Sequence, residues 1–216
     1  IDEAKEPVIK ALKDGDPGVR NAAACALGNY KGDDVVNALI AAMDDSDLSV
    51  RQSAISSLGM TGGEKATEPL IKSLKDSNID IRIYAASTLG NLKCKEAVEP
   101  LIELAKDRED SVRSTVLSSL GYIRDERAIP VLINALEDSS PYVRETAAWS
   151  VAYFKSKDSV EPLIKALENE KEQTCKSAMI YALGYTGDKR AVEPLLKLFK
   201  DETNKDILYR SEEHTS

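Results

Sequence analysis

Residues 97–121 read AVEPLIELAKDREDSVRSTVLSSLG and contain the complete pattern on which the fold depends. The first half carries apolar residues at helical spacing, with Pro100 in the first turn, where its missing N–H costs least. A short charged stretch then interrupts the helical pattern and supplies capping side chains for the next segment. The second half contains Val112-Arg113 and ends on Leu120-Gly121, again at helical spacing. The stretch therefore predicts two helices joined by a tight acidic turn.

The same pattern recurs along nearly the whole chain. The Val-Arg pair, or a close variant of it, returns at steps of 31, 31, 31, 31 and 32 residues, starting from Val19-Arg20. One helical hairpin of this length cannot bury its own apolar face, whereas stacked copies can. The sequence therefore predicts an all-α, right-handed α-solenoid of about six and a half two-helix repeats, without an internal domain boundary. The predicted units are residues 1–32, 33–63, 64–94, 95–125, 126–156, 157–188 and, as a partial unit, 189–209.

The unit AVEPLIxxL…VRxxAAxxLG resembles the short HEAT repeat that is named after phycobilisome (PBS) lyases. The resemblance covers residues 3 to about 208 and implies that the second helix of each unit lines the concave face. Deoxyhypusine hydroxylase, which has the same repeat, holds iron with repeated His-Glu pairs. This chain has no such pair, and its only histidine, His214, lies outside the repeats. We therefore expect no catalytic residue, no metal and no cofactor, and a protein that is not an enzyme.

The composition disfavours several classes of partner. The chain has 29 Lys and Arg residues against 37 Asp and Glu residues, which leaves a net charge of −8. Nucleic acid and anionic membranes bind clustered basic side chains, so neither is expected as a partner. No apolar run approaches the roughly 18–20 residues that span a bilayer. Cys25, Cys94 and Cys175 lie far apart and form no CxxC motif, which favours a reducing, cytoplasmic location.

One arginine recurs at the same place in successive units and predicts a column of guanidinium groups along the stack. Acidic residues in the neighbouring turns would join such a column through charge-assisted hydrogen bonds. A structural ladder of this kind is the favoured interpretation, and a row of arginines that binds a ligand is the alternative. The ladder residues are Arg20, Arg51, Arg82, Arg113 and Arg144.

Aromatic residues are concentrated in the second-helix positions that vary between units. If the repeat specifies the core, these variable positions face solvent. Tyr122, Tyr153 and Tyr185 share one position in three successive units, and Trp149 and Tyr181 share another, one turn earlier. The rings either form a recognition patch or cover alanine-rich seams between units. The predicted protein-binding residues are Tyr84, Tyr122, Trp149, Tyr153, Tyr181 and Tyr185.

Two functional hypotheses follow from these patterns. The first is a non-catalytic scaffold or adaptor that binds a protein or peptide on its concave face through the aromatic patch, because Tyr and Trp dominate interface hot spots. The alternative, which the family resemblance implies, is an accessory or chaperone subunit of a bilin lyase-like or other cofactor-handling enzyme.

The two ends of the chain look cut. Ile1 is not an initiator residue, and residues 210–216 leave the repeat register and match an in-frame translation of a sequencing adapter. We expect a metagenomic fragment whose tail at 210–216 is not native. Solenoid ends normally carry polar caps, and neither end shows one clearly, so self-association through uncapped ends is a further expectation.

Overall fold

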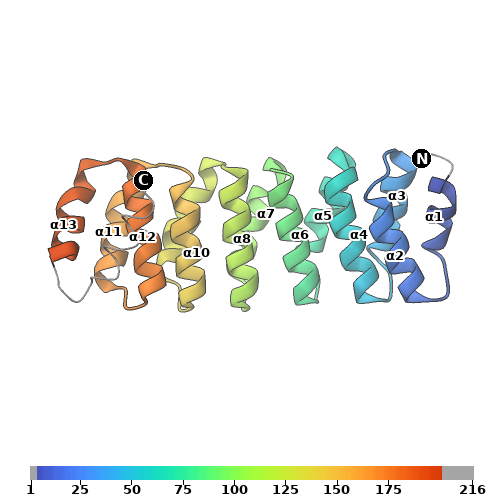
Figure 1. The fold of residues 1–216 in the computed structure, drawn as a ribbon, viewed down its shortest axis with the longest axis horizontal. Helices are drawn as coiled ribbons and strands as arrows, with labels where there is room; N and C mark the ends of the chain where they lie inside the picture. Colours follow the sequence, from blue (N-terminus) through green and yellow to red (C-terminus); the bar gives the residue numbers. More distant parts are fainter. Residues whose placement is uncertain (1–3, 201–216) are drawn as a thin grey trace. The chain divides into compact units, whose positions relative to one another are not determined.

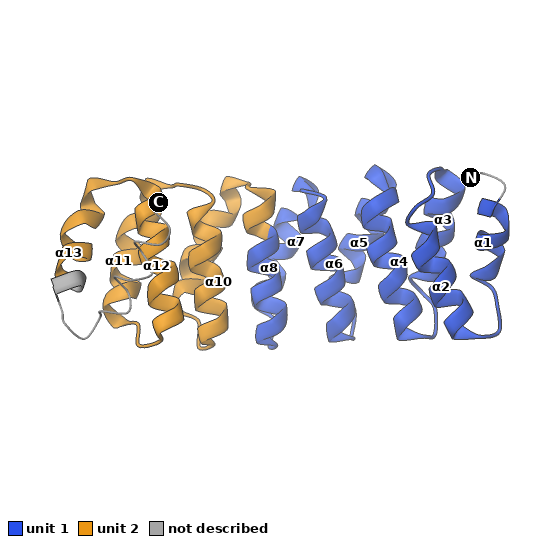
Figure 2. Cartoon of the chain, in the orientation of Figure 1, with its two compact units in different colours: residues 1–119 blue, residues 120–216 orange. Residues whose placement is uncertain are grey.

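A computed structural model of the chain describes residues 4–200, and side chains are described up to residue 197. The predicted tail at 210–216 and His214 lie outside these residues. Within the described part the chain is all-α, with thirteen α-helices and no strand (Figure 1). It divides into two compact units, residues 1–119 and 120–216, which are described separately (Figure 2).

The α-helices alternate between first and second members of each repeat. Unit 1 contains α1 (Lys5–Ala11), α2 (Pro17–Leu27), α3 (Asp33–Ala42), α4 (Leu48–Thr61), α5 (Thr67–Ser73), α6 (Ile79–Asn91), α7 (Val98–Leu104) and most of α8 (Asp110–Ile123). Unit 2 contains the end of α8, α9 (Ile129–Asn134), α10 (Pro141–Ala152), α11 (Val160–Asn169), α12 (Gln173–Thr186) and α13 (Val192–Lys200). The even-numbered helices are the second helices. In unit 1, α2 packs on α4 and α4 packs on α6, and in unit 2 α10 packs on α12.

Short polar side chains start the first three second helices, α2, α4 and α6. The carboxylates of Asp16 and Asp47 and the amide oxygen of Asn78 accept hydrogen bonds from the backbone N–H groups two residues later, at 2.7, 2.9 and 2.8 Å. These three residues lie 31 residues apart and precede α2, α4 and α6. Each satisfies a backbone donor that has no partner inside the helix, which stabilises the helix start by about 1 kcal/mol. The first three repeats therefore carry their own helix-start signal.

One to three residues after several second helices, a residue adopts the left-handed conformation that reverses the chain. Gly187 has this conformation after α12, with φ of 61°. Lys93, Arg124 and Lys155 adopt it with φ of 52°, 57° and 49°, and they follow one another at steps of 31 residues. Glycine is the usual residue in this conformation because it has no Cβ to clash. Three successive repeats thus have Lys or Arg at a position whose backbone conformation glycine adopts more easily.

Aliphatic side chains of both helices fill the core, as the periodicity predicts. Val50 and Ile81, which precede the recurring arginine in unit 1, are 0% and 2% exposed. Burial of each such side chain contributes about 1.5–3 kcal/mol. Val19 holds the same position in α2, and the helical spacing predicts that it faces inward, yet it is 41% exposed. Within the described residues, α2 packs on the second helix of one neighbouring repeat only, namely α4.

The Leu-Gly pairs mark places where adjacent second helices approach closely. A Cβ on Gly90 of α6 would lie 2.7 Å from both Cα and Cβ of Ser119 in α8. A Cβ on Gly59 would lie 2.8 Å from Cγ2 of Thr88. The small partner is itself repeated, because Ser57, Thr88 and Ser119 are 31 residues apart. Each glycine therefore makes room for a short polar side chain of the next repeat.

Candidate functional site

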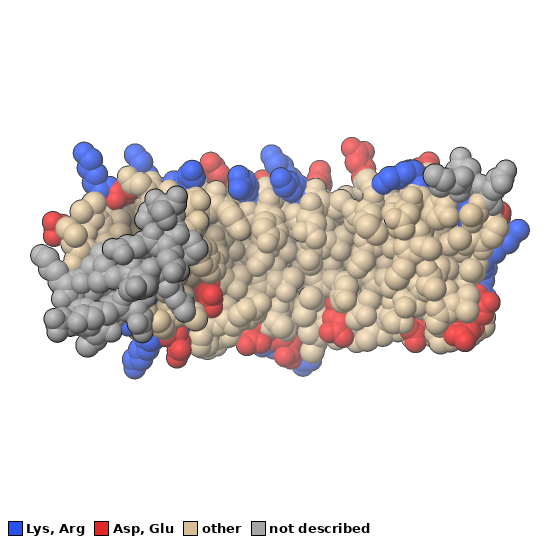
Figure 3. Space-filling model, viewed as in Figure 1, with Lys and Arg blue, Asp and Glu red and all other residues tan. Residues whose placement is uncertain are grey.

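The second-helix face of unit 1 is almost free of charged side chains. Figure 3 shows Lys, Arg, Asp and Glu gathered along two edges, with an uncharged surface between them over α2, α4 and α6. A shallow pocket of about 360 Å³ lies on this face. Within it, the hydroxyl of Ser53 donates a hydrogen bond to Oδ1 of Asn21 at 2.6 Å. The pocket is also lined by Gln52, Ser56, Met60 and Tyr84. This surface suits an uncharged, hydrogen-bonding contact.

Unit 2 carries a different surface, which we call the aromatic cluster. Its rings contact one another across three successive second helices. Tyr122 and Tyr153 have centroids 6.0 Å apart, Trp149 and Tyr181 are 4.7 Å apart, and Tyr181 stacks on Tyr185 at 4.7 Å. The neighbouring phenol of Tyr185 raises the pKa of Tyr181, so the Tyr181 ring is neutral near pH 7. The cluster comprises Tyr122, Trp149, Tyr153, Tyr181 and Tyr185.

Most of the aromatic cluster is open to solvent. Trp149 and Tyr153 are 40% and 42% exposed, and Tyr122 and Tyr185 are each 47% exposed, whereas Tyr181 is half-buried. A large part of four of the rings therefore has no protein contact among the described residues. Exposed aromatic surface of this kind marks interaction sites more often than it marks a stable free surface.

Two cations lie against the aromatic cluster. The guanidinium carbon of Arg124 is 5.5 Å from the centroid of Tyr153, and Nζ of Lys155 is 5.4 Å from the centroid of Tyr185. Both distances suit cation–π attraction. These are two of the residues that hold the left-handed conformation at the ends of second helices. In the part of the chain that the structure describes, no carboxylate lies within 4.0 Å of either cation.

The structure separates one predicted residue from the others. Tyr84 belongs to unit 1, where it is 40% exposed in the shallow pocket, and it takes part in none of the ring pairs among the described residues. Two variable positions that were expected to face solvent, Ser114 and Ala178, are buried. The hydroxyl of Ser114 donates to the carbonyl of Ser111 at 3.1 Å, which allows burial of the hydroxyl without loss of a partner.

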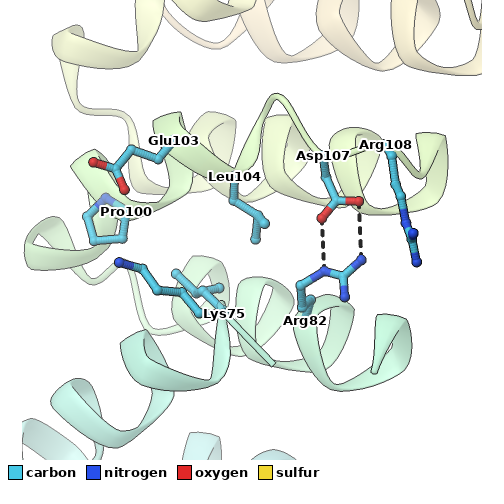
Figure 4. A pocket seen from close by; sticks show the side chains of 8 residues that line it. Lys75, Arg82, Pro100, Glu103, Leu104, Asp107 and Arg108 are labelled. Carbon is cyan, nitrogen blue, oxygen red and sulfur yellow. Dashed lines mark hydrogen bonds and ion pairs between the residues drawn. The ribbon is translucent and has the colours of Figure 1, made fainter. Parts of the chain in front are cut away.

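The recurring arginines lie at the turns within each repeat. In each of the five, Nη1 donates to two carbonyls of the preceding turn, as Arg82 does to Asp76 at 2.9 Å and to Ser77 at 3.2 Å. Nε and Nη2 of Arg82 also meet the carboxylate of Asp107, at 2.9 and 3.2 Å (Figure 4). This pair borders a pocket of about 500 Å³.

The carboxylate partners of the arginines come from the next repeat. Arg20 meets Asp45 at 2.7 and 2.8 Å, and Arg144 meets Glu170 at 2.6 and 2.9 Å, both in the two-pronged arrangement that suits guanidinium. Arg51 has no ion pair among the described residues and keeps its two carbonyl bonds. Every cationic group in these pairs therefore has protein partners, and the arrangement suits a role in stacking more than in binding a ligand.

The Arg144–Glu170 pair predicts a pH-dependent stability of unit 2. Glu170 is 8% exposed, and the guanidinium of Arg144 holds its pKa at about 2, below the usual 4.5. Because the pKa is lower in the folded state, the pair's contribution of about 3 kcal/mol is complete above about pH 4.5 and is lost as the pH falls towards 2. We expect Glu170→Gln to destabilise the protein at pH 7 and to converge on the wild type near pH 2 in denaturant titrations.

The control for that prediction is Glu168→Gln, which changes an exposed carboxylate two residues away. Its stability should follow the wild type at every pH. An equal effect of the two substitutions would show that the ion pair has no special share in acid unfolding.

The remaining reactive groups offer little chemistry. Burial raises the pKa of the thiols of Cys94 and Cys175, which disfavours the reactive thiolate. Within residues 4–200 no group of three or more His, Cys, Asp and Glu side chains is arranged to hold a metal ion. In the same range, every helix is too short or too polar to cross a membrane.

Comparison with known proteins defines the class. The family model for HEAT repeats matches residues 4–78, 67–139 and 129–213, so the chain belongs to the HEAT repeat family and has its α-solenoid fold. No curated protein matches the chain.

Several solved structures share the fold. A chain from the complex of CpcE and CpcF of phycocyanin lyase from Nostoc sp. PCC7120 is 29% identical, with 88% of this chain and 79% of that chain covered and a TM-score of 0.62. Escherichia coli YibA is 23% identical over 97% of this chain and 80% of its own, with a TM-score of 0.72. A designed armadillo repeat protein in complex with the peptide (KR)4 is 17% identical over 83% and 98%, with a TM-score of 0.60.

Proposed function

We propose that the protein is a non-catalytic binding module that captures a protein or peptide segment on the aromatic cluster of unit 2. The observation that supports this most directly is the exposure of Tyr122, Trp149, Tyr153 and Tyr185, each at 40% or more. Repeat solenoids with the same fold include a subunit pair, CpcE with CpcF, and a designed binder of a peptide. On binding, the exposed surface of the rings would be buried against the partner segment.

The arrangement of the rings supports efficient binding. Tyr153 contacts both Tyr122 and Arg124, Trp149 contacts Tyr181, and Tyr181 stacks on Tyr185, so each ring has a neighbour that restricts its rotation. The rings stand on helices and helix ends of the solenoid, where little main-chain ordering is required on binding. A surface that is ordered before it meets its partner loses less entropy, and more of the buried area then contributes to affinity.

The test is selection of binders from a random peptide library on the wild type, followed by affinity measurement on the double variant Trp149→Ala/Tyr153→Ala. Loss of two hot-spot rings should weaken the selected peptides by at least about thirtyfold. The matched control is Tyr142→Ala, on the same helix as Trp149. Tyr142 is 61% exposed but belongs to no ring pair in the described chain. The proposal would be wrong if both variants bound the peptides as the wild type does.

A second candidate function is an accessory subunit of a cofactor-handling enzyme, and it is favoured by the 29% identity to the phycocyanin lyase chain. Under this hypothesis the same cluster would contact a partner subunit or a flat conjugated ligand. Co-expression with the partner chain and an absorbance spectrum of the purified complex would test it. A visible absorbance band that depends on Trp149 would favour this function over peptide capture.

A further inference from the structure

We propose that the segment held by the aromatic cluster is acidic, and that Arg124 and Lys155 pair with its carboxylates. This inference rests on the proposed function and specifies the chemistry of the partner. It is carried by the two cations that lie on Tyr153 and Tyr185 and that form no ion pair within 4.0 Å among the described residues.

The first step of the argument concerns what these cations leave unused. A contact with the face of a ring is worth about 0.5–1 kcal/mol at an exposed site and involves none of the N–H donors in a hydrogen bond. Guanidinium has five such donors and ammonium has three. Arg124 and Lys155 are both exposed, and no hydrogen bond of either side chain is found within the described residues. Both therefore keep their donors available for a carboxylate.

The second step concerns how the cations are positioned. Each follows a second helix in the left-handed conformation, which disfavours a residue with a Cβ by roughly 1–2 kcal/mol relative to glycine. The equivalent residue after α12 is Gly187, so the fold accepts glycine here. The favourable contact of a cation with the helix C-terminus offsets part of that cost. The result is that each cation lies against the tyrosine of the following repeat, and the 31-residue period sets the spacing between the two.

The third step concerns the sign of charge that the partner segment can carry. A lysine or arginine of a partner would approach rings whose nearby cations repel it, whereas a carboxylate would be attracted. Glu145, the nearest variable acidic position of α10, is half-buried and lies eight residues before Tyr153, about 12 Å along the helix. The net charge of −8 would repel an acidic partner, but at physiological salt the repulsion from charges farther than about 8 Å away is largely screened. Local charge therefore favours Asp and Glu in the bound segment.

The experiment uses the full chain and the same random peptide library. Peptides selected on the wild type are expected to be enriched in Asp and Glu, and peptides selected on Arg124→Gln/Lys155→Gln should lose that enrichment. Affinity of the wild-type peptides for the double variant should fall about tenfold, and the difference should shrink at high salt. The control Lys165→Gln/Lys171→Gln removes the same charge from α11 and the turn after it, and should bind as the wild type does.

The outcomes separate this inference from the function on which it rests. Enrichment of Lys and Arg, or equal affinity of the wild type and Arg124→Gln/Lys155→Gln for the selected peptides, would overturn the acidic partner and leave the aromatic cluster intact. Failure to select any peptide that depends on Trp149 and Tyr153 would instead overturn the proposed function itself.

Discussion

Gly90→Ala is expected to lower the free energy of unfolding by about 3 kcal/mol. The new methyl group would lie 2.7 Å from Cα of Ser119, and a main-chain atom cannot move aside as the end of a flexible side chain can. The helices α6 and α8 would have to separate at this point, and the buried side chains around them would lose contact. Equilibrium unfolding in denaturant, followed by circular dichroism, measures the change.

Gly184→Ala is the matched control, because Gly184 of α12 holds the position that Gly90 holds in α6, directly after a leucine. A Cβ on Gly184 meets no atom within 4 Å in the described chain, and its φ is not in the left-handed region. Alanine is a better helix former than glycine by about 0.5–1 kcal/mol, so this substitution should stabilise the protein by up to that amount. Similar effects of the two alanines would show that helix propensity, not the approach of Ser119, determines the outcome.

Arg82→Ala is the second substitution with a large expected effect. Removal of the guanidinium leaves the carboxylate of Asp107, whose side chain is 10% exposed, without its cation. It also removes the donors to the carbonyls of Asp76 and Ser77. Loss of one partner of a buried ion pair costs about 3–5 kcal/mol, most of which is the desolvation of the charge left behind. A thermal unfolding scan of the variant should show a strongly lowered midpoint.

Comparison of Arg82→Ala with Arg51→Ala separates the stabilisation by the ion pair from that by the carbonyl hydrogen bonds. Arg51 makes the same two carbonyl contacts, at 2.8 and 3.2 Å, and within the described residues it has no carboxylate partner. Its loss should cost about 1–2 kcal/mol, clearly less than the loss of Arg82. If Arg51→Ala proved as damaging as Arg82→Ala, the carbonyl bonds would account for the stabilisation and the ion pairs would be incidental.

The candidate site shows how far a repeat pattern reaches. Variable positions on second helices were expected to face solvent, and the rings at Tyr122, Trp149, Tyr153 and Tyr185 do so. Their contacts with one another could be expected too, because equal positions on stacked helices are neighbours. Whether the cluster binds a partner stays a prediction. The cations over the rings were missed, because Arg124 and Lys155 follow the helix ends, and the sequence contains no glycine there to signal a left-handed turn.

The arginine column shows what the repeat pattern leaves undetermined. The recurrence of Arg20, Arg82 and Arg144 with acidic turns nearby indicates charge-assisted bonds. Acidic residues occur before and after each arginine, so the sequence leaves the partner open. The structure assigns the carboxylate to the following repeat in each of these three cases. In unit 2 an inserted residue shifts the partner from aspartate to Glu170, and the longer side chain still reaches Arg144.

The sequence by itself determined the HEAT repeat fold, the helix pairs and the concentration of aromatic residues on second helices. These properties depend on period and on short-range signals such as the caps at Asp16 and Asp47, which are complete within a few residues. Only the tertiary structure decided which carboxylate meets which arginine, how closely Gly90 approaches Ser119, and which cation lies on which ring. Each of those contacts joins residues 25 to 30 positions apart, and its geometry depends on how neighbouring helices pack side by side.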